Sequence, residues 1–480
     1  MATTTREQRI RDPLHNLIEF GADEFEATLW RAIQTRPFQR LRRIKQLGFS
    51  ELVYPGATHT RFAHSIGTFH TARQLVGIIN RQSGKHDLEH RAKLALAGAL
   101  VHDLGHGMFS HAFEDIGKVL GLKLAHHEHV SNELIRNSEI AEEFSALGKS
   151  FAGEVADLIK QSGPRTIYDA VVSSQFDADR LDYMQRDRLM TGVQSSGIDF
   201  TWLIANLKLG KLRAGVDEEE IGEIETFVLG PKADRAAEGF VLSLFQLYPN
   251  VYFHKATRGA EKLFSVLMTQ LVTLVQNDSL HRTGLPKNHP IVRFALEPNT
   301  LENVLGLDDS VFWGSLPMLA GASEPCVSKM AIALSERRLH KSLDVLERLD
   351  GKLRSKAHSQ DARKRTNAKI DTTAAVVEDR LKEWSEKNST VVPRLLVDRA
   401  IRDPYKKFQE SKGPLNQIRI QGAGAELLDM AEISPVVAAI EPFSLFRVYF
   451  DRDDKDARVA VERIIDDAIK CGKKRVSTGA

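Results

Sequence analysis

The sequence predicts a mainly α-helical fold with a few short strands added to it. Apolar residues recur at helical spacing through long stretches, most clearly in 61–79 and 236–275. Strand-like patterns are short: 203–229 alternates charged and apolar residues around glycines and predicts a hairpin, and 443–450 (FSLFRVYF) predicts a strand before a charged helix at 455–471. We therefore expect a helical core with small hairpin and strand additions and a mixed α/β C-terminal region.

Before the central part of the chain, helices alternate with short irregular segments. Proline cannot donate to a strand ladder but suits the first turn of a helix, and glycine often follows a helix end. We expect an extended segment in 9–20 with a turn at Asp12-Pro13, followed by a helix at 24–35. A second helix is expected to begin at Pro37 and to end at Gly48, with Leu41, Ile44 and Leu47 on its apolar face. A loop at 53–60 and a helix that begins in 61–65 should follow.

Composition places the chain among globular proteins and limits the metal site it can hold. Its 480 residues, 42% of them hydrophobic, allow a substantial core and two or three domains. The net charge of +2 argues against a polycation that binds nucleic acid with its whole surface. Cys326 and Cys471 lie far apart, so a metal must be held by histidines and carboxylates. No apolar run approaches about 18 residues and the N-terminus lacks a signal-peptide core, so we expect a cytoplasmic protein without a membrane span.

The stretch Gly98–His111 (GALVHDLGHGMFSH) is the chemical centre of the chain. A helical run ends there in the adjacent pair His102-Asp103, and Gly105 and Gly107 follow. One imidazole nitrogen and one carboxylate oxygen are the mixture of ligands that a hard or borderline divalent cation takes. Glycines beside them let the backbone approach a ligand closely. A single His-Asp pair is common by chance, so further ligands are needed elsewhere.

Two other segments supply such residues. His64 lies near the start of a predicted helix, and the tract Asp177-Ala178-Asp179 opens another. With His102-Asp103 between them, the order is His, His-Asp, Asp on successive helices. Two neutral imidazoles and two carboxylates leave two positions open on a six-coordinate metal. A water and a phosphate oxygen suit those positions.

The tract 173–192 carries a second group of reactive side chains. Asp179, Tyr183 and Asp187 are spaced i, i+4 and i+8, so they share one helix face, and Arg180 lies beside them. The alternative is a solvated amphipathic face with ion pairs, although the apolar residues in the tract are not typical of one. We choose Asp179 as the metal ligand because these groups follow it at helical spacing.

Seven phrases of the sequence together resemble one protein family. They cover about residues 9–260 in the family's order: DPLHNLIEF, PFQRLRRIKQLG, YPGATHTRFAHSIG, HDLGHGMFSH, HHEHVSNELI, DADRLDYMQRD and YFHK. The sequence is similar to the HD-domain phosphohydrolases, and more narrowly resembles the deoxynucleoside triphosphate triphosphohydrolases. The strand around FRVYF and the helix after it weakly resemble the family's terminal segment.

The resemblance implies a helical HD-domain core, a metal and a reaction. One divalent ion (Mn, Fe, Mg, Ni, Co or Zn) would be held by His64, His102, Asp103 and Asp179, and additional Mg is compatible with the family. Family members cleave between the nucleoside oxygen and the α-phosphate, releasing deoxynucleoside and tripolyphosphate. We expect residues 1–275 to form the phosphohydrolase domain with an N-terminal regulatory or oligomerisation segment, and 276–480 to complete the fold and the oligomer interface.

The resemblance also implies roles for individual side chains. His111 and His127 match histidines that flank the α-phosphate, and either could protonate the leaving 5′-oxygen; the alternative for each is an ordinary satisfied polar residue. Glu114, commonly Asp in relatives, would orient His111. His106 and His126 are expected to be supporting or structural. The implied substrate-binding residues are Gln46, Leu47, Arg61, Arg180, Tyr183, Asp187, Tyr248 and Tyr252, and the implied regulatory-nucleotide residues are Gln39, Arg42, His254 and Lys255.

Three positions depart from the family pattern. Leu244 stands where an arginine for the phosphate tail is expected, and Tyr248 stands where relatives can carry a histidine. Gln34 replaces an acidic residue that recognises guanine in the family's regulatory site. We therefore do not expect a guanine-specific activator, while activation by another nucleotide and constitutive activity both stay open.

Two alternative functions remain at this point. The same metal site could serve nucleoside mono- or diphosphates, modified nucleotides or phosphodiesters, which the missing arginine at position 244 favours. The chain could instead be a nucleotide sensor that binds single-stranded nucleic acid through 352–369, a run with seven basic residues and one acidic residue. A solvated loop or exposed helix explains that run better than a phosphate-rich partner does. Family members form oligomers, so a homodimer or homotetramer is expected.

Overall fold

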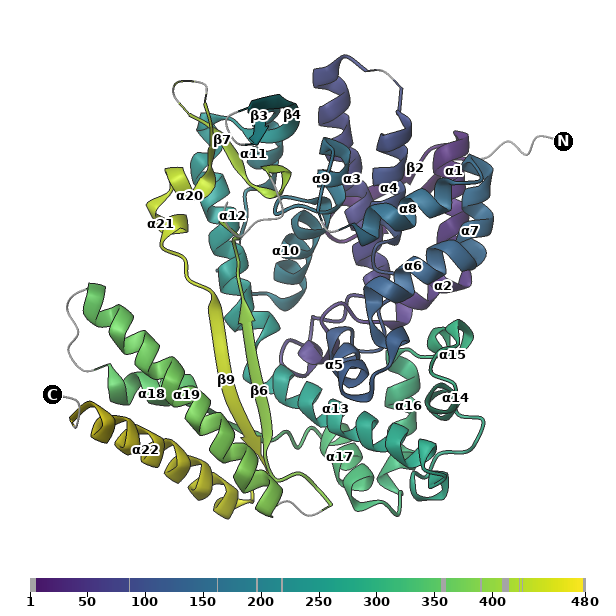
Figure 1. Cartoon of the computed structure of the whole chain (residues 1–480). Coiled ribbons are helices and arrows are strands. Elements are labelled where there is room, and N and C mark those ends of the chain that lie inside the picture. The colour runs from purple at the N-terminus through teal and green to yellow at the C-terminus, as the bar shows by residue number, and fades with distance from the viewer. Residues whose placement is uncertain are drawn as a thin grey trace. The chain divides into compact units, whose positions relative to one another are not determined.

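The computed structural model describes residues 6–477 except 86, 162, 196, 217–218, 355–359, 389–390, 408–413, 423 and 425. Helices dominate the described chain, and sheets of two, four and three strands accompany them (Figure 1). The predicted mainly α fold with hairpin and strand additions is confirmed. No helix in the described ranges has the length and apolar character that crossing a bilayer requires.

The chain forms two compact units, each assembled from three segments. The first unit comprises Met1–Phe253, Pro286–Gly314 and Asp403–Glu441, and the second comprises His254–Leu285, Ser315–Arg402 and Pro442–Ala480. The expected division at residue 275 falls inside helix α13 (Lys255–Gln276) of the second unit. As a functional boundary it stays a prediction.

The first unit begins with the hairpin expected at 9–20. Strand β1 (Gln8–Asp12) pairs antiparallel with β2 (Asn16–Phe20). Asp12 Oδ1 accepts the backbone N–H groups of Leu14 and His15, each at 2.9 Å, which closes the turn. Asp23 then caps α1 (Glu24–Gln34) by accepting from the backbone of Glu26.

The helix predicted from Pro37 to Gly48 is shorter than expected. Helix α2 (Arg36–Arg40) continues only as the 3₁₀ turn η1 (Leu41–Arg43), and Ile44 is extended (φ −117°, ψ 115°). The reason is a tertiary backbone pairing: Gln46 N donates to His59 O at 3.0 Å, and Arg61 N donates to Ile44 O at 2.9 Å. Gly48, predicted to end the helix, instead begins the 3₁₀ turn η2 (Gly48–Leu52).

The core of the first unit is built around α3 (Arg61–Ser83), on which α4 (His90–Val101) and α10 (Ala178–Thr191) pack (Figure 1). The predicted apolar face of α3 is confirmed, because Ile66, Phe69, Leu75 and Ile79 are all buried. Around these helices lie α5 (His111–Leu120), α6 (His127–Asn137), α7 (Glu139–Phe144), α8 (Phe151–Lys160), α9 (Ile167–Val172) and α11 (Phe200–Ala205).

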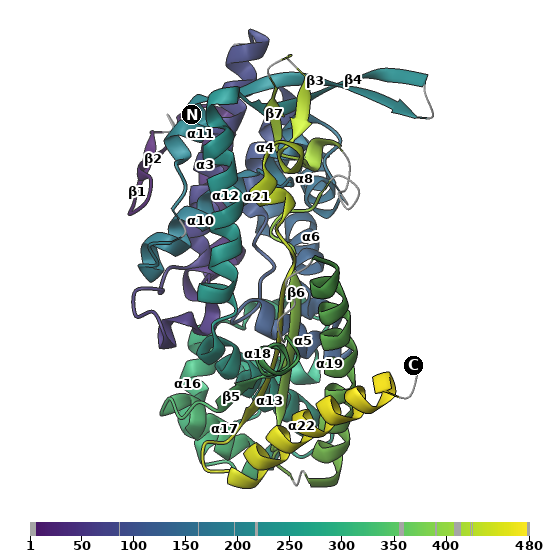
Figure 2. The same cartoon turned by 90° about the vertical axis from the view of Figure 1, so that its left-hand side faces the viewer.

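The predicted hairpin in 203–229 is also present. Strands β3 (Leu207–Val216) and β4 (Glu219–Leu229) form an elongated antiparallel ribbon (Figure 2), and the sheet continues through the short strands β7 (Arg419–Gln421) and β8 (Leu427–Asp429) in the order β3-β4-β7-β8. The unit is completed by α12 (Asp234–Leu247), the π turn η6 (Tyr248–Tyr252), α14 (Pro290–Leu296), α15 (Leu301–Leu305), the start of α16 (Asp309–Ala320), α20 (Met430–Ile433) and α21 (Pro435–Ala438).

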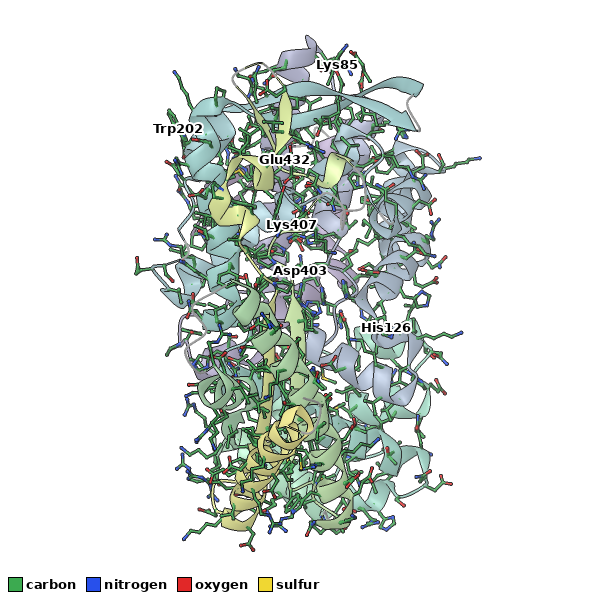
Figure 3. All side chains as sticks on the ribbon, turned by 60° about the vertical axis from the view of Figure 1, so that its left-hand side comes forward. Lys85, His126, Trp202, Asp403, Lys407 and Glu432 are labelled. Atoms are coloured by element: carbon green, nitrogen blue, oxygen red, sulfur yellow. The ribbon has the colours of Figure 1, made fainter. Side chains whose placement is uncertain are left out.

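The segment 403–441 joins the first unit through buried polar contacts. Gln175 Nε2 donates to the carbonyls of Lys406 and Asn416, both at 2.9 Å. Within the segment itself, Lys407 Nζ donates to Ala438 O at 2.8 Å. Asp403, Lys407 and Glu432 mark the course of the segment in Figure 3. A stretch remote in sequence therefore supports the backbone just before α10.

The second unit pairs a small antiparallel sheet with helices. Strand β9 (Phe443–Phe450), which has the bounds predicted for it, lies between β5 (Lys341–Asp344) and β6 (Leu396–Arg402). Helices α18 (Val345–Leu353), α19 (Gln360–Asn388) and α22 (Lys455–Ser477) share a core with this sheet that includes Leu349, Val377, Phe446 and Val461. Helices α13 and α17 (Pro325–Ser335) pack together in the same unit.

Candidate metal centre and neighbouring histidine cluster

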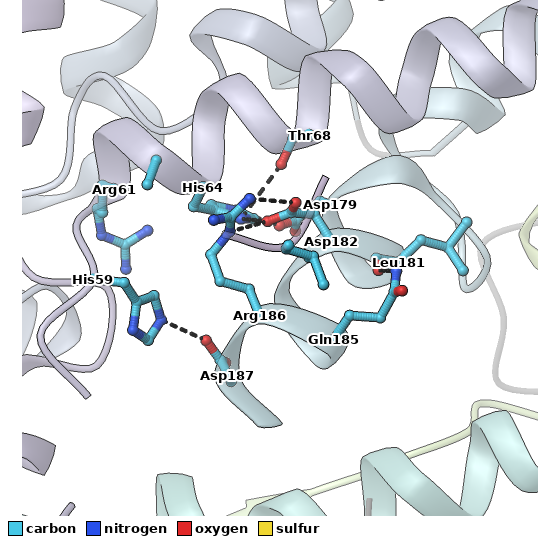
Figure 4. Close-up of polar contacts among 12 residues, drawn as sticks. His59, Arg61, His64, Thr68, Asp179, Leu181, Asp182, Gln185, Arg186 and Asp187 are labelled. Carbon is cyan, nitrogen blue, oxygen red and sulfur yellow. Dashed lines mark hydrogen bonds and ion pairs between the residues drawn. The ribbon is translucent and has the colours of Figure 1, made fainter. Parts of the chain in front are cut away.

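His64 lies in the first turn of α3, and both of its ring nitrogens face carboxylates. The residue is fully buried. Its Nδ1 lies 2.8 Å from Asp182 Oδ2, and its Nε2 lies 2.9 Å from Asp179 Oδ1 (Figure 4). Both aspartates belong to α10, which packs on α3, so the helix pairing itself brings the carboxylates to the imidazole.

His102 and Asp103 follow the end of α4 and face the same point. His102 Nδ1 contacts the carbonyl of Ala99 at 2.9 Å, while Nε2 lies 3.3 Å from Asp103 Oδ1 and 3.6 Å from Asp179 Oδ1. Asp103 Oδ2 accepts a hydrogen bond from Arg61 Nη1. Burial alone would raise the pKa of Asp103, but the Arg61 guanidinium and the neighbouring histidines hold it well below its usual range.

The donor set fits a divalent cation. Ligand atoms of His64, His102 and Asp103 lie within 4.8 Å of one another, and Asp179 adds a second carboxylate beside both imidazoles. The Nε2 atoms of His64 and His102 are buried and have no hydrogen bond in the described part of the chain. The Ala99 carbonyl can only accept, so His102 must donate from Nδ1, and a neutral ring then directs its Nε2 lone pair to the centre. Nitrogen lone pairs beside carboxylates are the ligands such an ion takes.

A second cluster lies next to this centre. Ligand-type atoms of His106, His111, Glu114 and His127 also lie within 4.8 Å of one another. His106 connects the two groups: its Nε2 lies 3.2 Å from Asp103 Oδ1, and its Nδ1 lies 4.0 Å from Glu114 Oε1. Its ring stacks on that of His127 with centroids 4.0 Å apart. The stacked rings of His106 and His127 therefore bring the HDLGH and HHEH segments into contact.

Glu114 contacts His127 more closely than His111, the residue it was expected to orient. Its Oε1 is hydrogen bonded to His127 Nδ1, whereas His111 Nδ1 lies 3.4 Å away. The reason is position: His111 and Glu114 are neighbours on the first turn of α5, while His127 begins α6 and points back at the carboxylate. Burial would raise the pKa of Glu114, but the favourable interactions of the carboxylate with His111 and His127 hold it well below its usual range. The carboxylate is therefore ionised at neutral pH.

His111 and His106 differ in exposure. The His111 side chain is 71% exposed, against 25% for His127. His106 is buried, and burial together with the nearby Arg61 and His127 charges holds its pKa well below the usual histidine value. His106 is thus a neutral ring between Asp103 and Glu114, consistent with the supporting role expected for it.

A strained turn connects the two clusters. Phe109 and Ser110, directly before α5, both have positive φ values, 53° and 57°. Asp309 bridges this turn to another loop, because its Oδ1 accepts from Phe109 N at 2.8 Å and its Oδ2 accepts from Lys45 N at 2.9 Å. Arg61 Nε donates to Ser110 Oγ at 2.9 Å. Burial raises the pKa of Asp309 to about 7.

Aromatic and acidic side chains lie further along the same face of α10, beyond Asp179. Asp187 contacts His59 Nε2 at 2.8 Å (Figure 4). It also accepts a hydrogen bond from Tyr252 Oη at 2.8 Å. The Tyr183 and Tyr252 rings meet edge to face, 6.2 Å between centroids, and Tyr248 meets Tyr252 at 5.9 Å. Four of the residues implied to bind substrate are therefore neighbours. His59 had no expected role, although its place in the YPGATHT phrase could have indicated one.

The remaining expected residues are placed as follows. Arg180 Nε donates to Ser174 O at 3.1 Å, and Gln46 Oε1 is buried without a hydrogen bond among described residues. Arg42 Nε donates to Gln39 Oε1 at 2.8 Å, so these two expected regulatory residues contact each other in the first unit. Leu47 precedes η2 there, whereas His254 and Lys255 begin α13 in the second unit.

Comparison with known proteins identifies the fold around these clusters. Residues 61–185, which span His64 through Asp179, match the HD domain family. The chain contains an HD domain. A crystal structure of a phosphohydrolase from Bacteroides thetaiotaomicron has the same fold, with a TM-score of 0.68 and 22% identity over 93% of this chain and 100% of that one.

Relatives of known sequence extend the likeness beyond the HD domain. An uncharacterised Bacillus subtilis protein, YwfO, is 33% identical over 310 residues, which is 64% of this chain and 65% of that protein. A Dictyostelium discoideum homologue of the deoxynucleoside triphosphate triphosphohydrolase SAMHD1 is 36% identical over 180 residues, 36% of this chain and 35% of that protein. The match thus spans less than two thirds of either relative.

Proposed function

We propose that this protein hydrolyses deoxynucleoside triphosphates to deoxynucleoside and tripolyphosphate. The observation that carries the proposal is the pair of adjacent clusters, a metal-type donor set beside a carboxylate–histidine group, linked by His106 between Asp103 and Glu114. Hydrolysis of a phosphate ester needs both a site that polarises the phosphoryl group and a proton donor for the leaving oxygen. The SAMHD1-type relatives support the choice of substrate.

His64, His102, Asp103 and Asp179 would hold one divalent ion. When bound, such an ion supplies Lewis-acid polarisation and an activated water. Arg61 and Arg180 carry the guanidinium groups suited to phosphate oxygens.

The histidine cluster would handle the proton. The ionised Glu114 holds Nδ1 of His127, which leaves Nε2 of that ring to give a proton to the 5′-oxygen. His111, also beside Glu114 but exposed, is the alternative donor. Asp187, with Tyr252 and His59 bonded to it, offers an acceptor for a sugar hydroxyl, and the tyrosine rings beside it can crowd out a 2′-hydroxyl.

A second proposal keeps the metal centre and changes the substrate. Leu244, where an arginine for the phosphate tail was expected, is buried in α12, so no cation is offered from that position. This favours nucleoside mono- or diphosphates, modified nucleotides or phosphodiesters.

Nucleic-acid binding through 352–369 has less support. In that run, Lys352 pairs with Asp466 and Arg354 pairs with Asp350. Lys356 and the side chains of Arg363 and Lys364 lie outside the described residues. A nucleotide activator, an additional Mg ion, a cytoplasmic location and assembly into dimers or tetramers remain proposals carried by the family resemblance alone.

The test is product analysis with the purified chain. Each of the four deoxynucleoside triphosphates and ATP, singly and in mixtures, is incubated with manganese or magnesium, with Asp179→Ala as the matched control. Deoxynucleoside and intact tripolyphosphate are expected from the wild type only, and a mixture that is hydrolysed when its components are not reveals an activator. If every triphosphate survives, the proposal fails and monophosphates, phosphodiesters and single-stranded nucleic acid are tested next.

A further inference from the structure

We propose that Asp182 is a positioning residue for the metal centre, which fixes His64 with Nε2 facing the metal, and that Gly67 provides the space in which it does so. The inference rests on the metal centre of the proposed function but not on its substrate. Sequence reasoning did not single out Asp182, which lies three residues after Asp179 on α10.

The four acceptor positions of the Asp182 carboxylate are filled. Oδ2 accepts from His64 Nδ1 at 2.8 Å and from Arg186 Nε at 2.8 Å (Figure 4). Oδ1 accepts from Arg186 Nη2 at 2.9 Å and from His15 Nε2 at 2.7 Å. An ionised carboxylate has about four lone-pair positions and no proton. Asp182 can therefore only accept, so His64 must donate from Nδ1.

The arrangement orients the ligand as well as its proton. The Asp182 side chain has no exposed surface, so water does not compete for the Nδ1 proton. Thr68 Oγ1 is the other neighbour of this nitrogen, at the longer distance of 3.4 Å. With Nδ1 held, a neutral ring has its lone pair on Nε2, the atom that has no hydrogen bond and that lies beside Asp179. Partners of this kind typically set the tautomer and basicity of a metal-binding histidine.

The N-terminal hairpin completes the arrangement. His15 follows the β1–β2 turn, and Asp12 of the same turn accepts from Arg186 Nη1 at 2.8 Å and Nη2 at 3.3 Å. Arg186 is thereby held between two carboxylates, Asp12 and Asp182, while buried. The first phrase of the sequence, DPLH, thus acts on the metal centre through Arg186 and Asp182 rather than by touching it.

Gly67 is required because the buried ion pair lies against α3. A Cβ atom at Gly67 would lie 2.0 Å from Asp182 Oδ1 and 2.2 Å from Arg186 Nη2, so neither group could stay in place. Gly77 on the same helix offers a control, since a Cβ there meets only the flexible end of Arg81 at 3.4 Å. Alanine favours helix over glycine by about 1 kcal/mol at either position. Loss of metal binding in Gly67→Ala alone would then come from displacing the pair.

The first experiment measures the Mn²⁺ dissociation constant of the metal-stripped chain by calorimetry, alongside its melting temperature. Asp182→Asn places an amide among groups that all donate, and we expect its dissociation constant to rise roughly 10- to 100-fold. Asp398→Asn is the matched control, because Asp398 is equally buried and pairs with Arg258 in the second unit. It should lower the melting temperature without changing the dissociation constant. Wild-type affinity in Asp182→Asn would overturn the inference.

Two further comparisons separate positioning from general destabilisation. In a His64→Gln background, Asp182→Asn should add no further loss of Mn²⁺ affinity, because Asp182 acts through His64; independent, additive losses would contradict this. Gly67→Ala should weaken Mn²⁺ binding while Gly77→Ala does not, and equal affinities in the two would also overturn the inference. This pair decides the matter if Asp182→Asn does not fold.

Failure of the substrate proposal is distinguishable from failure of this one. Normal Mn²⁺ binding with every nucleotide intact would contradict the proposed substrate and leave the role of Asp182 standing. A wild-type chain that binds no Mn²⁺ would contradict the metal centre and this inference with it.

Discussion

The metal centre and the histidine cluster beside it use the same residue types but hold them differently. In the metal centre, each imidazole has its Nδ1 occupied by a separate protein acceptor, Asp182 or the Ala99 carbonyl. In the cluster, His106, His111 and His127 all lie near one carboxylate, Glu114, and His111 is largely exposed. A metal ligand needs one lone pair in one direction, whereas a proton donor must exchange its proton and reach its substrate. The hydrogen bonds that hold the histidines thus differ as their proposed roles differ, metal binding in one group and proton transfer in the other.

The largest expected effect on hydrolysis comes from replacing the proposed metal ligands. Replacing His102 and Asp103 together by alanine, or Asp179 by alanine, removes ligands whose partners cannot substitute for them. Bound metal and hydrolysis should be lost together, to background. Metal content per chain by plasma mass spectrometry, measured on the same samples as turnover, checks this. Undiminished turnover in a variant without metal would refute the metal centre.

The next effect belongs to the cluster alone. His127→Ala should keep the metal and lower kcat by roughly 10²- to 10⁴-fold, as the loss of a general acid does. His111→Ala should cost less, because Glu114 bonds to His127 and not to His111 at hydrogen-bond distance. Turnover at saturating substrate, with metal content as control, ranks the two. A larger loss in His111→Ala would assign the proton to His111.

A smaller effect concerns the shared carboxylate. Glu114→Gln keeps the shape of the side chain but removes its charge, and we expect kcat to fall roughly 10- to 100-fold, as for other orienting partners. Because the pKa of Glu114 is held well below its usual range, the residue is ionised throughout pH 5 to 8. The comparison is therefore between a charged and an uncharged side chain of the same shape, with metal content of both proteins as the control. A wild-type kcat in Glu114→Gln would contradict the orienting role.

Replacing Asp309, which accepts a hydrogen bond from the strained turn, should change the rate least. It should, however, change how the stability of the protein depends on pH. Its pKa of about 7 lies above the ordinary 3.8, so the folded state binds this proton more tightly than the unfolded state. The wild type should lose stability as pH rises from about 4 to 7, by roughly 2–3 kcal/mol between pH 5 and 8 relative to Asp309→Asn. Urea unfolding at several pH values measures the difference. Parallel profiles for the two proteins would contradict it.

Long, periodic elements could be predicted from sequence because their pattern is local. The 61–79 periodicity predicted α3, and the short segment FSLFRVYF predicted β9 with its exact bounds. The helix from Pro37 failed at Ile44, whose backbone extends so that Gln46 and Arg61 can pair with residues on the adjoining segment. Helical spacing at 41, 44 and 47 contained no information about that partner.

The residues of the candidate site also fall into those that the sequence could predict and those that depend on tertiary contacts. Nitrogen and oxygen ligands in the phrases around His64, His102 and Asp179 could be recognised from residue type and order, and the structure brings them together. The partner of Glu114 could not be derived, since a carboxylate one turn from His111 reveals nothing about α6 returning to it. His59 and Asp182 were missed because their roles depend on which helix lies opposite.

By itself, the sequence determined the helical fold class and the residue types that can bind a metal, because both depend on local spacing and chemistry. Its phrases also indicated an HD domain by their resemblance to a known family. Only the tertiary structure decided which ring nitrogen of each metal-centre histidine is hydrogen bonded to the protein and which faces the centre. Asp182 and His15 are 167 residues apart, yet their hydrogen bond and the space at Gly67 depend on α3, α10 and the first hairpin meeting at one point. A hydrogen bond acts over about 3 Å, and only packing brings groups so distant in the chain within that range.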